Sequence, residues 1–413
     1  MKLVKNLCRI IVGIVFIYSG FVKGIDPLGS DYKFSDYFNA FGMGWMNATT
    51  LFFSFALSLA EFLIGIALLF NLWVSRLAWG SLLFMFFFTP LTLVLALTNP
   101  VSDCGCFGDA MVLTNWQTFW KNIILLLLTI MVFVYRREYK SSLPLMGQFS
   151  FLALAGTGML CLSIYCYRHL PVLDFRPYAV GKNITEEMRL PEGAETNQYK
   201  VTLKYRNKQT GKIQSFTEEN YPWQDTLNWE YESSSEQLVK KGYITPIHDL
   251  VIEHPTFGNI TDEILEDNNH TLLAVAYDLN QSDTQCQPVI NRLAEYAREK
   301  GFRFYGLTSS TEQDIEAYKK RHHVPYEFCT ADEIQLKTMI RSNPGVIVLR
   351  EGTILGKWAG KDVPGKELQE TDLTAYCVHS REQMQRIYLV YSIILLFFVA
   401  YLLIPRKKGK RNY

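Results

Sequence analysis

The stretch that decides the fold is segment 77–97, LAWGSLLFMFFFTPLTLVLAL, which is followed after a short polar gap by a second apolar segment at 116–135. Each is close to the ~20 residues that an α-helix needs to cross the hydrocarbon core of a bilayer. The gap carries the run DCGCFGD at 103–109, in which one glycine separates Cys104 from Cys106. The sequence therefore predicts a pair of thiols at a membrane surface.

Similar apolar runs occur elsewhere in the 413-residue chain, of which 49% is apolar. They lie at Leu3–Phe21, Leu51–Leu72, Ser150–Tyr167 and Ile387–Ile404. With the two segments above they predict an α-helical membrane bundle of about six transmembrane helices. The first run follows basic residues as a signal peptide does, but its apolar part is long and Gly20–Gly24 is a poor cleavage site, so we interpret it as a retained span.

Basic residues flank these runs unevenly. They are Lys2, Lys5, Arg9, Arg76, Arg136, Arg137, Lys140, Arg406, Lys407, Lys408, Lys410 and Arg411. With six spans all of them fall on one side, which the positive-inside rule assigns to the cytoplasm together with both termini. The loop Gly24–Thr50, the two-cysteine loop and a long segment from about Arg168 to Arg386 are then extracytoplasmic. We expect a bacterial inner membrane protein whose periplasmic side permits lasting disulfides.

The net charge of +1 is close to neutral. It offers no basic footprint for nucleic acid, so we expect no nucleic-acid partner. The partners that the sequence does predict are the lipid bilayer and an extracytoplasmic protein client or redox partner.

The long soluble segment divides at about residue 243. Its first part contains the alternating stretches 199–205 and 213–216 around the turn 207–211, which predicts a small β-hairpin unit. From 244 the pattern becomes strand, helix, strand, helix, strand, strand, helix. Its strands are expected at 271–277, 302–307, 346–349 and 353–358, and its helices at 288–300, from a Ser310 cap through Arg321, and at 365–377.

That order resembles the thioredoxin-like fold. Asn343-Pro344-Gly345 precedes a strand and hairpin at the position where thioredoxin-like proteins carry a cis-proline, so Pro344 is the candidate. Where the family has Cys-X-X-Cys, this chain has Asp283-Thr-Gln-Cys286, and a dithiol cycle needs two thiols. The domain is then a docking or sensing module. Cys286 is either a candidate for thiol exchange at a helix N-terminus or a small buried apolar residue.

The membrane part carries a second resemblance. Phe16-Ile-Tyr-Ser-Gly20-Phe-Val-Lys23 with Asp26-Pro27 resembles the first span of the DoxX family, and Asp103-Cys-Gly-Cys-Phe-Gly108 is similar to MauE proteins of methylamine utilisation. The match covers about residues 1–140. It implies a four-helix unit associated with extracytoplasmic disulfide chemistry, as MauE proteins are with disulfide formation in a periplasmic dehydrogenase. Nothing in the sequence indicates that this chain is concerned with methylamine.

We therefore predict an α-helical membrane bundle with an α/β thioredoxin-like soluble domain and a small β unit. The divisions are a DoxX/MauE-like four-helix domain at 1–140, a fifth transmembrane helix at 141–170, a β-rich unit at 171–243, a thioredoxin-like domain at 244–378, a sixth transmembrane helix at 387–405 and a basic cytoplasmic tail at 406–413.

Cys104 and Cys106 can close only a small disulfide ring, whose strain makes the bond easier to reduce. The alternatives are a static disulfide or a pair of free thiols. Two cysteines without a nearby histidine or second pair fall short of the usual four metal ligands, so we expect no metal. Asp103 and Asp109 should raise the pKa values of the thiols, unless a cation such as Lys23 lies close.

Glu61 lies near the middle of the second span. A carboxyl group is costly there unless it faces protein or water, so we expect it to point inward. It could act as a proton relay or contact a quinone, or it could be a hydrogen-bonded packing residue. Gly13, Gly20 and Gly24 share one face of the first span and predict close helix packing.

Two hypotheses follow. The leading one is a membrane thiol-disulfide redox protein, a candidate oxidoreductase, in which Cys104 and Cys106 act on envelope proteins. No cofactor is established by the sequence, and a bilayer quinone is the candidate electron acceptor. The alternative is a non-enzymatic envelope scaffold, whose incomplete thioredoxin-like domain binds protein partners.

Overall fold

The computed structural model describes residues 2–101, 103–195, 198–217, 220–223, 225–240, 242–243, 245–365 and 372–382. The predicted sixth transmembrane helix at 387–405 and the basic tail at 406–413 lie outside the described residues.

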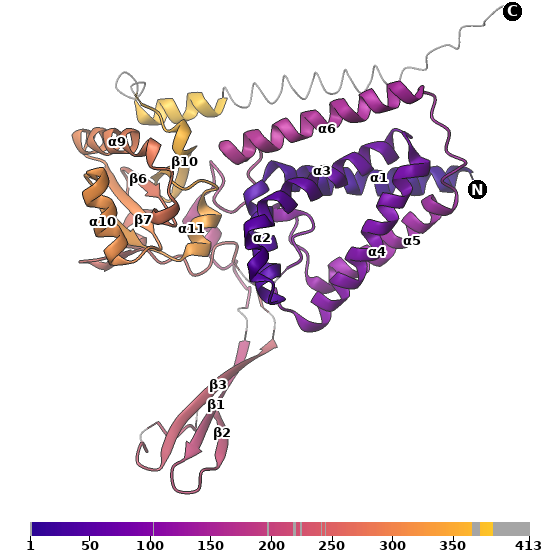
Figure 1. Cartoon of the computed structure of the whole chain (residues 1–413). Coiled ribbons are helices and arrows are strands. Elements are labelled where there is room, and N and C mark those ends of the chain that lie inside the picture. The colour runs from indigo at the N-terminus through magenta and orange to yellow at the C-terminus, as the bar shows by residue number, and fades with distance from the viewer. Residues whose placement is uncertain are drawn as a thin grey trace, which may run out of the picture.

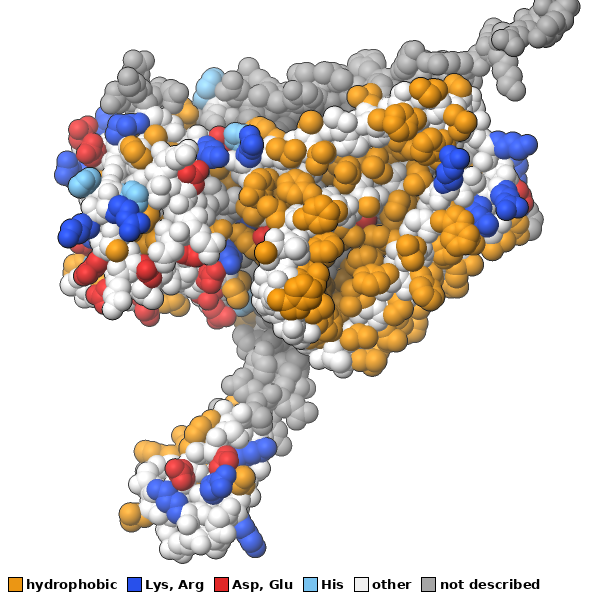
Figure 2. Space-filling model, in the orientation of Figure 1, with side chains coloured by type: hydrophobic (Ala, Val, Ile, Leu, Met, Phe, Trp, Pro, Cys, Tyr) orange, Lys and Arg blue, Asp and Glu red, His pale blue; other side chains and the backbone are white. Residues whose placement is uncertain are grey.

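Five described helices are long and apolar enough to cross a membrane, which indicates an integral membrane protein. They are α1 (Lys2–Ile25), α3 (Thr50–Leu69, preceded by the 3-10 turn η1, Gly44–Thr49), α4 (Val74–Thr98), α5 (Asn115–Val134) and α6 (Leu145–Arg168). They match the first five predicted apolar runs. Figure 2 shows that hydrophobic side chains cover the outer face of this part of the molecule, as contact with lipid requires.

The segment Gly24–Thr50 is not the simple loop that the sequence predicted. It contains α2 (Pro27–Ala40), which lies across the end of the bundle (Figure 1). The Asp26 carboxylate caps this helix by accepting a hydrogen bond from the Gly29 amide, and Pro27 occupies its first turn. Both features are signals of a helix start. The helix was not predicted because it has too few apolar residues to resemble a membrane span.

Helices α1 and α3 pack backbone to backbone. A Cβ atom at Gly20 would lie 2.5 Å from the Phe62 backbone nitrogen, and one at Gly65 would lie 2.5 Å from that of Ile17. The predicted glycine face of the first span therefore meets α3 at Gly13 and Gly20, while Gly24 faces Met159 of α6. This close approach brings the side chains of α1 and α3 into direct contact.

The C-terminal half is a mixed α/β domain whose seven-stranded sheet has the order β10-β9-β6-β7-β8-β4-β5. The strands are β4 (Glu253–His254), β5 (Gly258–Asn259), β6 (His270–Val275), β7 (Arg303–Thr308), β8 (Glu327–Thr330), β9 (Gly345–Arg350) and β10 (Thr353–Ala359). Strands β6, β7 and β8 are parallel, and β9 is antiparallel to both of its neighbours. The helices are α8 (Thr261–Leu265), α9 (Gln287–Lys300), α10 (Glu312–His322), α11 (Glu333–Met339) and a helix at 373–382.

The four predicted strands and the helix at 288–300 are confirmed. The sequence missed β4, β5, β8, α8 and α11, and the cap of α10 was wrong by one residue. The Thr311 hydroxyl accepts the capping hydrogen bond from the Asp314 amide, whereas the Ser310 hydroxyl accepts one from the Leu279 amide in the neighbouring loop. Residues 366–371 of the predicted closing helix lie outside the described part of the chain.

Apolar clusters cover both faces of this sheet. One of them includes Tyr178 and Ile184, the latter in the short helix α7 (Ile184–Met188). This part of segment 171–243 therefore packs into the α/β domain. The rest forms a three-stranded antiparallel sheet of β1 (Gln198–Asn207), β2 (Ile213–Thr217) and β3 (Trp229–Lys240), which projects away from the other domains (Figure 1). The predicted hairpin is its β1–β2 pair.

Candidate functional site

Cys104 and Cys106 lie in the loop between α4 and α5, just before the 3-10 turn η2 (Gly108–Ala110). Both are free thiols, and their Sγ atoms lie 2.8 Å apart, so one donates a hydrogen bond to the other. Gly105 between them has a φ of +63°, a conformation that other residues adopt only with strain. The glycine therefore allows the turn that brings the two sulfurs together.

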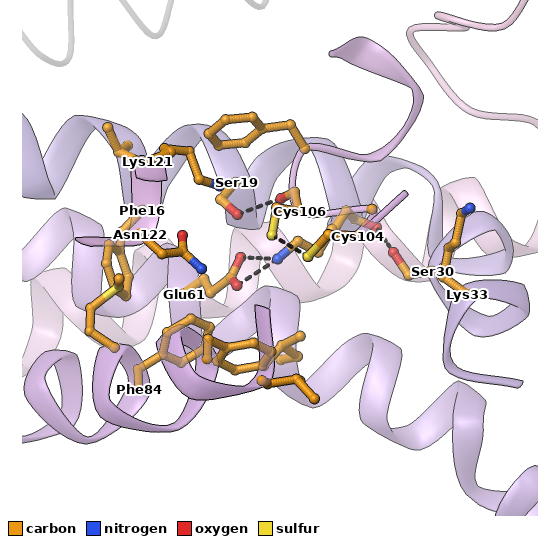
Figure 3. A pocket seen from close by; sticks show the side chains of 18 of the residues that line it. Phe16, Ser19, Ser30, Lys33, Glu61, Phe84, Cys104, Cys106, Lys121 and Asn122 are labelled. Atoms are coloured by element: carbon orange, nitrogen blue, oxygen red, sulfur yellow. Dashed lines mark hydrogen bonds and ion pairs between the residues drawn. The ribbon is translucent and has the colours of Figure 1, made fainter. Parts of the chain in front are cut away.

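Two neighbouring helices hold this loop. The Tyr37 hydroxyl of α2 donates to the Cys104 carbonyl at 2.6 Å. The Ser19 hydroxyl of α1 donates to the Cys106 carbonyl at 2.8 Å (Figure 3). Lys33 of α2 pairs with Asp103 at 2.7 Å. Side chains of α1 and α2 thus anchor the two-cysteine loop.

A buried ion pair lies next to the thiols. The Lys23 ammonium of α1 donates to both Glu61 carboxylate oxygens of α3, at 2.5 and 2.6 Å, and the two residues are 8% and 2% exposed. Lys23 and Glu61 line the same pocket as both cysteines, and Figure 3 shows Glu61 close to the two sulfurs. Glu61 points inward as expected, and its partner is the same Lys23 that the sequence named as a cation able to offset the aspartates.

One pocket is shared by the two cysteines and the buried ion pair. It is lined by Cys104, Cys106, Lys23 and Glu61, and its apolar wall includes Phe34, Phe84 and Phe88. We call it the thiol pocket. It brings together three of the five residues that the sequence proposed as functional.

The two thiols differ in acidity. The hydrogen bond from Cys104, with the cations Lys121 and Lys23, lowers the pKa of Cys106 to about 6, although burial and Glu61 act in the opposite direction. The same hydrogen bond, together with burial, raises the pKa of Cys104. In this arrangement Cys106 is the more acidic thiol of the pair.

The sequence predicted that the flanking aspartates would raise the pKa values of the thiols unless a cation such as Lys23 lay close, and Lys23 does contribute to the lowered pKa of Cys106. Asp103 pairs with Lys33 and Asp109 with Arg341 at 3.0 Å, so nearby cations offset both carboxylates. Sequence reasoning missed Lys121, which stands on α5. The capping box of Thr114 and Gln117 fixes where this helix starts, but which of its side chains face the thiols depends on how the helix packs.

Arg341 joins the α/β domain to the membrane region. Its buried guanidinium pairs with Asp26 at 3.1 Å as well as with Asp109, and it lies over the ring of Tyr32 in α2. The buried guanidinium makes charge-assisted hydrogen bonds to both carboxylates, which hold the two segments in fixed positions relative to it. No local pattern in the sequence distinguishes this arginine, because its partners are more than 230 residues away.

Cys286 and Pro344 line a different pocket, together with Arg341. The Cys286 thiol is buried and donates to the Asp283 carbonyl at 2.9 Å, and the Asn343–Pro344 peptide bond is cis. Burial, and then the charge of Asp283, raise the pKa of Cys286. The structure therefore brings Cys286 and Pro344 together but places neither in the thiol pocket. Among the described residues no cluster of His, Cys, Asp and Glu is suited to a metal ion.

The helices α1 to α5 and the anchored two-cysteine loop form one unit. Residues 1–135 match the family model of the methylamine utilisation protein MauE. The predicted MauE resemblance is thereby confirmed for a membrane region that contains Cys104, Cys106, Lys23, Glu61 and Lys121. Residues 199–241, a range that includes most of the three-stranded sheet, match a domain of unknown function, DUF8463. A search of curated proteins finds no match to the chain.

Proposed function

We propose that this protein is an integral membrane thiol-disulfide redox protein, in which Cys104 and Cys106 cycle between dithiol and disulfide. The observation that carries the proposal is the pair itself: two sulfurs 2.8 Å apart, with the pKa of Cys106 lowered and that of Cys104 raised. A nucleophile beside a protonated second thiol is the arrangement that disulfide exchange requires.

The exchange balances within the pair and one partner disulfide. The Cys106 thiolate attacks one partner sulfur, and the other partner sulfur leaves as a thiolate. Cys104 then loses its proton and attacks the Cys106 sulfur, which releases the second partner thiolate and leaves a Cys104–Cys106 disulfide. The pair gives up two electrons, and the partner gains them. The reverse sequence oxidises a partner dithiol.

The partner in this proposal is an extracytoplasmic protein, and the α/β domain is its docking module. The positive-inside pattern supports an outward-facing thiol loop in a bacterial inner membrane. A thioredoxin-like character of the domain is supported by the strand order β10-β9-β6-β7, by Cys286 at the start of α9 and by Pro344 in the same pocket. Arg341 would hold the docked partner near the thiol loop through Asp26 and Asp109.

The test is a redox titration of the purified full-length protein in glutathione buffers, with the Cys104–Cys106 bond quantified by mass spectrometry. We expect one reversible two-electron transition, which Cys104→Ser abolishes. Cys161→Ser is the matched control, because Cys161 is exposed on α6 and lies outside the thiol pocket. A pair that stays fully oxidised or fully reduced across all buffers would support the scaffold hypothesis instead.

A further inference from the structure

We propose that the thiol pocket binds a lipid-soluble quinone, which exchanges two electrons with Cys104 and Cys106. This inference rests on the redox function proposed above and names the second substrate of the same site.

The thiol pocket lies where a bilayer molecule can reach it. Its wall is formed on one side by α2 and α3 and on the other by α4, and Figure 2 shows the apolar face hollowed between these elements. Phe84 and Phe88 line the pocket and are half-buried, whereas their neighbours Leu83 and Phe87 are 70% and 62% exposed on the outer face. A ligand entering there comes from the hydrocarbon layer and must be lipid-soluble.

The wall of the pocket suits a flat ring. Phe84 and Phe88 stack at a centroid distance of 4.3 Å, and Phe16 meets Phe84 edge to face at 5.2 Å. Aromatic walls of this kind favour stacked or edge-on contacts with another planar π-system. A flexible acyl chain would gain apolar contact there but no such geometry.

The other end of the pocket is charged. Lys23, Glu61 and Lys121 line it together with both cysteine residues (Figure 3). An acyl chain makes no polar interaction with these groups, and burying charges costs free energy. A quinone does use them, because its oxygens become negative as it accepts electrons, and a cation in an apolar site stabilises that charge strongly.

The electron and proton balance is complete with a quinone and one proton from solvent. Cys106 thiolate and Cys104 thiol form the disulfide and give two electrons to the quinone, while Cys104 releases one proton. The quinone takes up that proton and a second one from solvent to become a quinol. The Lys23–Glu61 pair stands beside the sulfurs and is the group placed to pass the second proton. The reverse reaction reduces the disulfide with a quinol.

The experiment uses the reduced full-length protein in detergent and decyl-ubiquinone as the probe. Quinol formation is followed by absorbance and disulfide formation by mass spectrometry. We expect one quinol per disulfide. Phe88→Ala should raise the KM for the quinone about tenfold, through loss of the stacked wall. Phe86→Ala is the matched control and should leave the KM unchanged, since Phe86 is 69% exposed and does not line the pocket.

The glutathione titration separates the outcomes. If the pair titrates normally with glutathione but forms no quinol, the quinone inference is wrong and the redox function stands. If the pair reacts with neither glutathione nor the quinone, both the redox function and the quinone inference are wrong. Equal KM values for Phe86→Ala and Phe88→Ala, or a retained phospholipid that the quinone does not displace, would also overturn the assignment of the pocket.

Discussion

Replacing Cys106 with serine is expected to slow the alkylation of the thiol pair by iodoacetamide at pH 7 on the order of 10- to 100-fold. With a pKa of about 6, roughly nine tenths of Cys106 is thiolate at that pH. The thiol that remains in Cys106→Ser is Cys104, whose pKa is raised. Cys104→Ser keeps the reactive thiolate, because a serine hydroxyl can still donate to it, and should stay within a few-fold of the native rate.

The pH dependence of the alkylation rate tests whether Cys106 is the nucleophile. Because the folded-state pKa of Cys106 is lowered, its reaction rate should be nearly constant above pH 7 and fall as the pH drops through about 6. Unfolded protein is the control, and its thiols should react with the midpoint near 8.5 of an ordinary cysteine. A native midpoint near 8.5, or equal rates for Cys104→Ser and Cys106→Ser, would contradict the assignment of Cys106 as the nucleophile.

Removing one partner of the buried Lys23–Glu61 pair should destabilise the membrane region by about 3–5 kcal/mol. Lys23→Met leaves the Glu61 carboxylate without its ammonium, at a position that is 2% exposed. Glu61→Gln leaves the Lys23 charge uncompensated. Thermal or denaturant unfolding in detergent measures the loss. Lys23→Met should also slow Cys106 alkylation at pH 6, since Lys23 contributes to the lowered pKa of Cys106.

Two further variants make this prediction specific. Replacing both partners, Lys23→Met with Glu61→Met, should recover most of the stability, because apolar side chains of similar volume replace a buried pair well. Lys182→Met breaks a half-exposed pair with Glu187 and should cost less than about 1 kcal/mol. Single variants as stable as the native protein, or a double variant no better than the singles, would show that the pair does not support the fold.

Local patterns in the sequence predicted much of this site. Hydropathy located five helices, and Cys104, Cys106 and the inward direction of Glu61 followed from chemistry that is unusual at a membrane. Each of these inferences needs only neighbouring residues. A thiol pair between two spans is reactive, and a carboxyl group within a span is costly, whatever the arrangement of the helices.

The parts that were missed depend on contacts between distant segments. The pairing of Arg341 with Asp26 and Asp109 joins two domains, and the position of Lys121 depends on how α5 packs. Strand β8 has only two buried residues, Phe328 and Cys329, which is too short a pattern for periodicity. Helix α2 lacks the apolar stripe that marks a buried helix.

The redox state of Cys104 and Cys106 in intact cells tests the central claim most directly. Cells receive a membrane-impermeant reductant and then an impermeant maleimide of known mass, with Cys104→Ser as the control. We predict that the native pair changes from disulfide to two labelled thiols and returns to disulfide when the reductant is removed. A pair whose labelling never changes with the reductant would contradict both the redox function and the outward-facing loop.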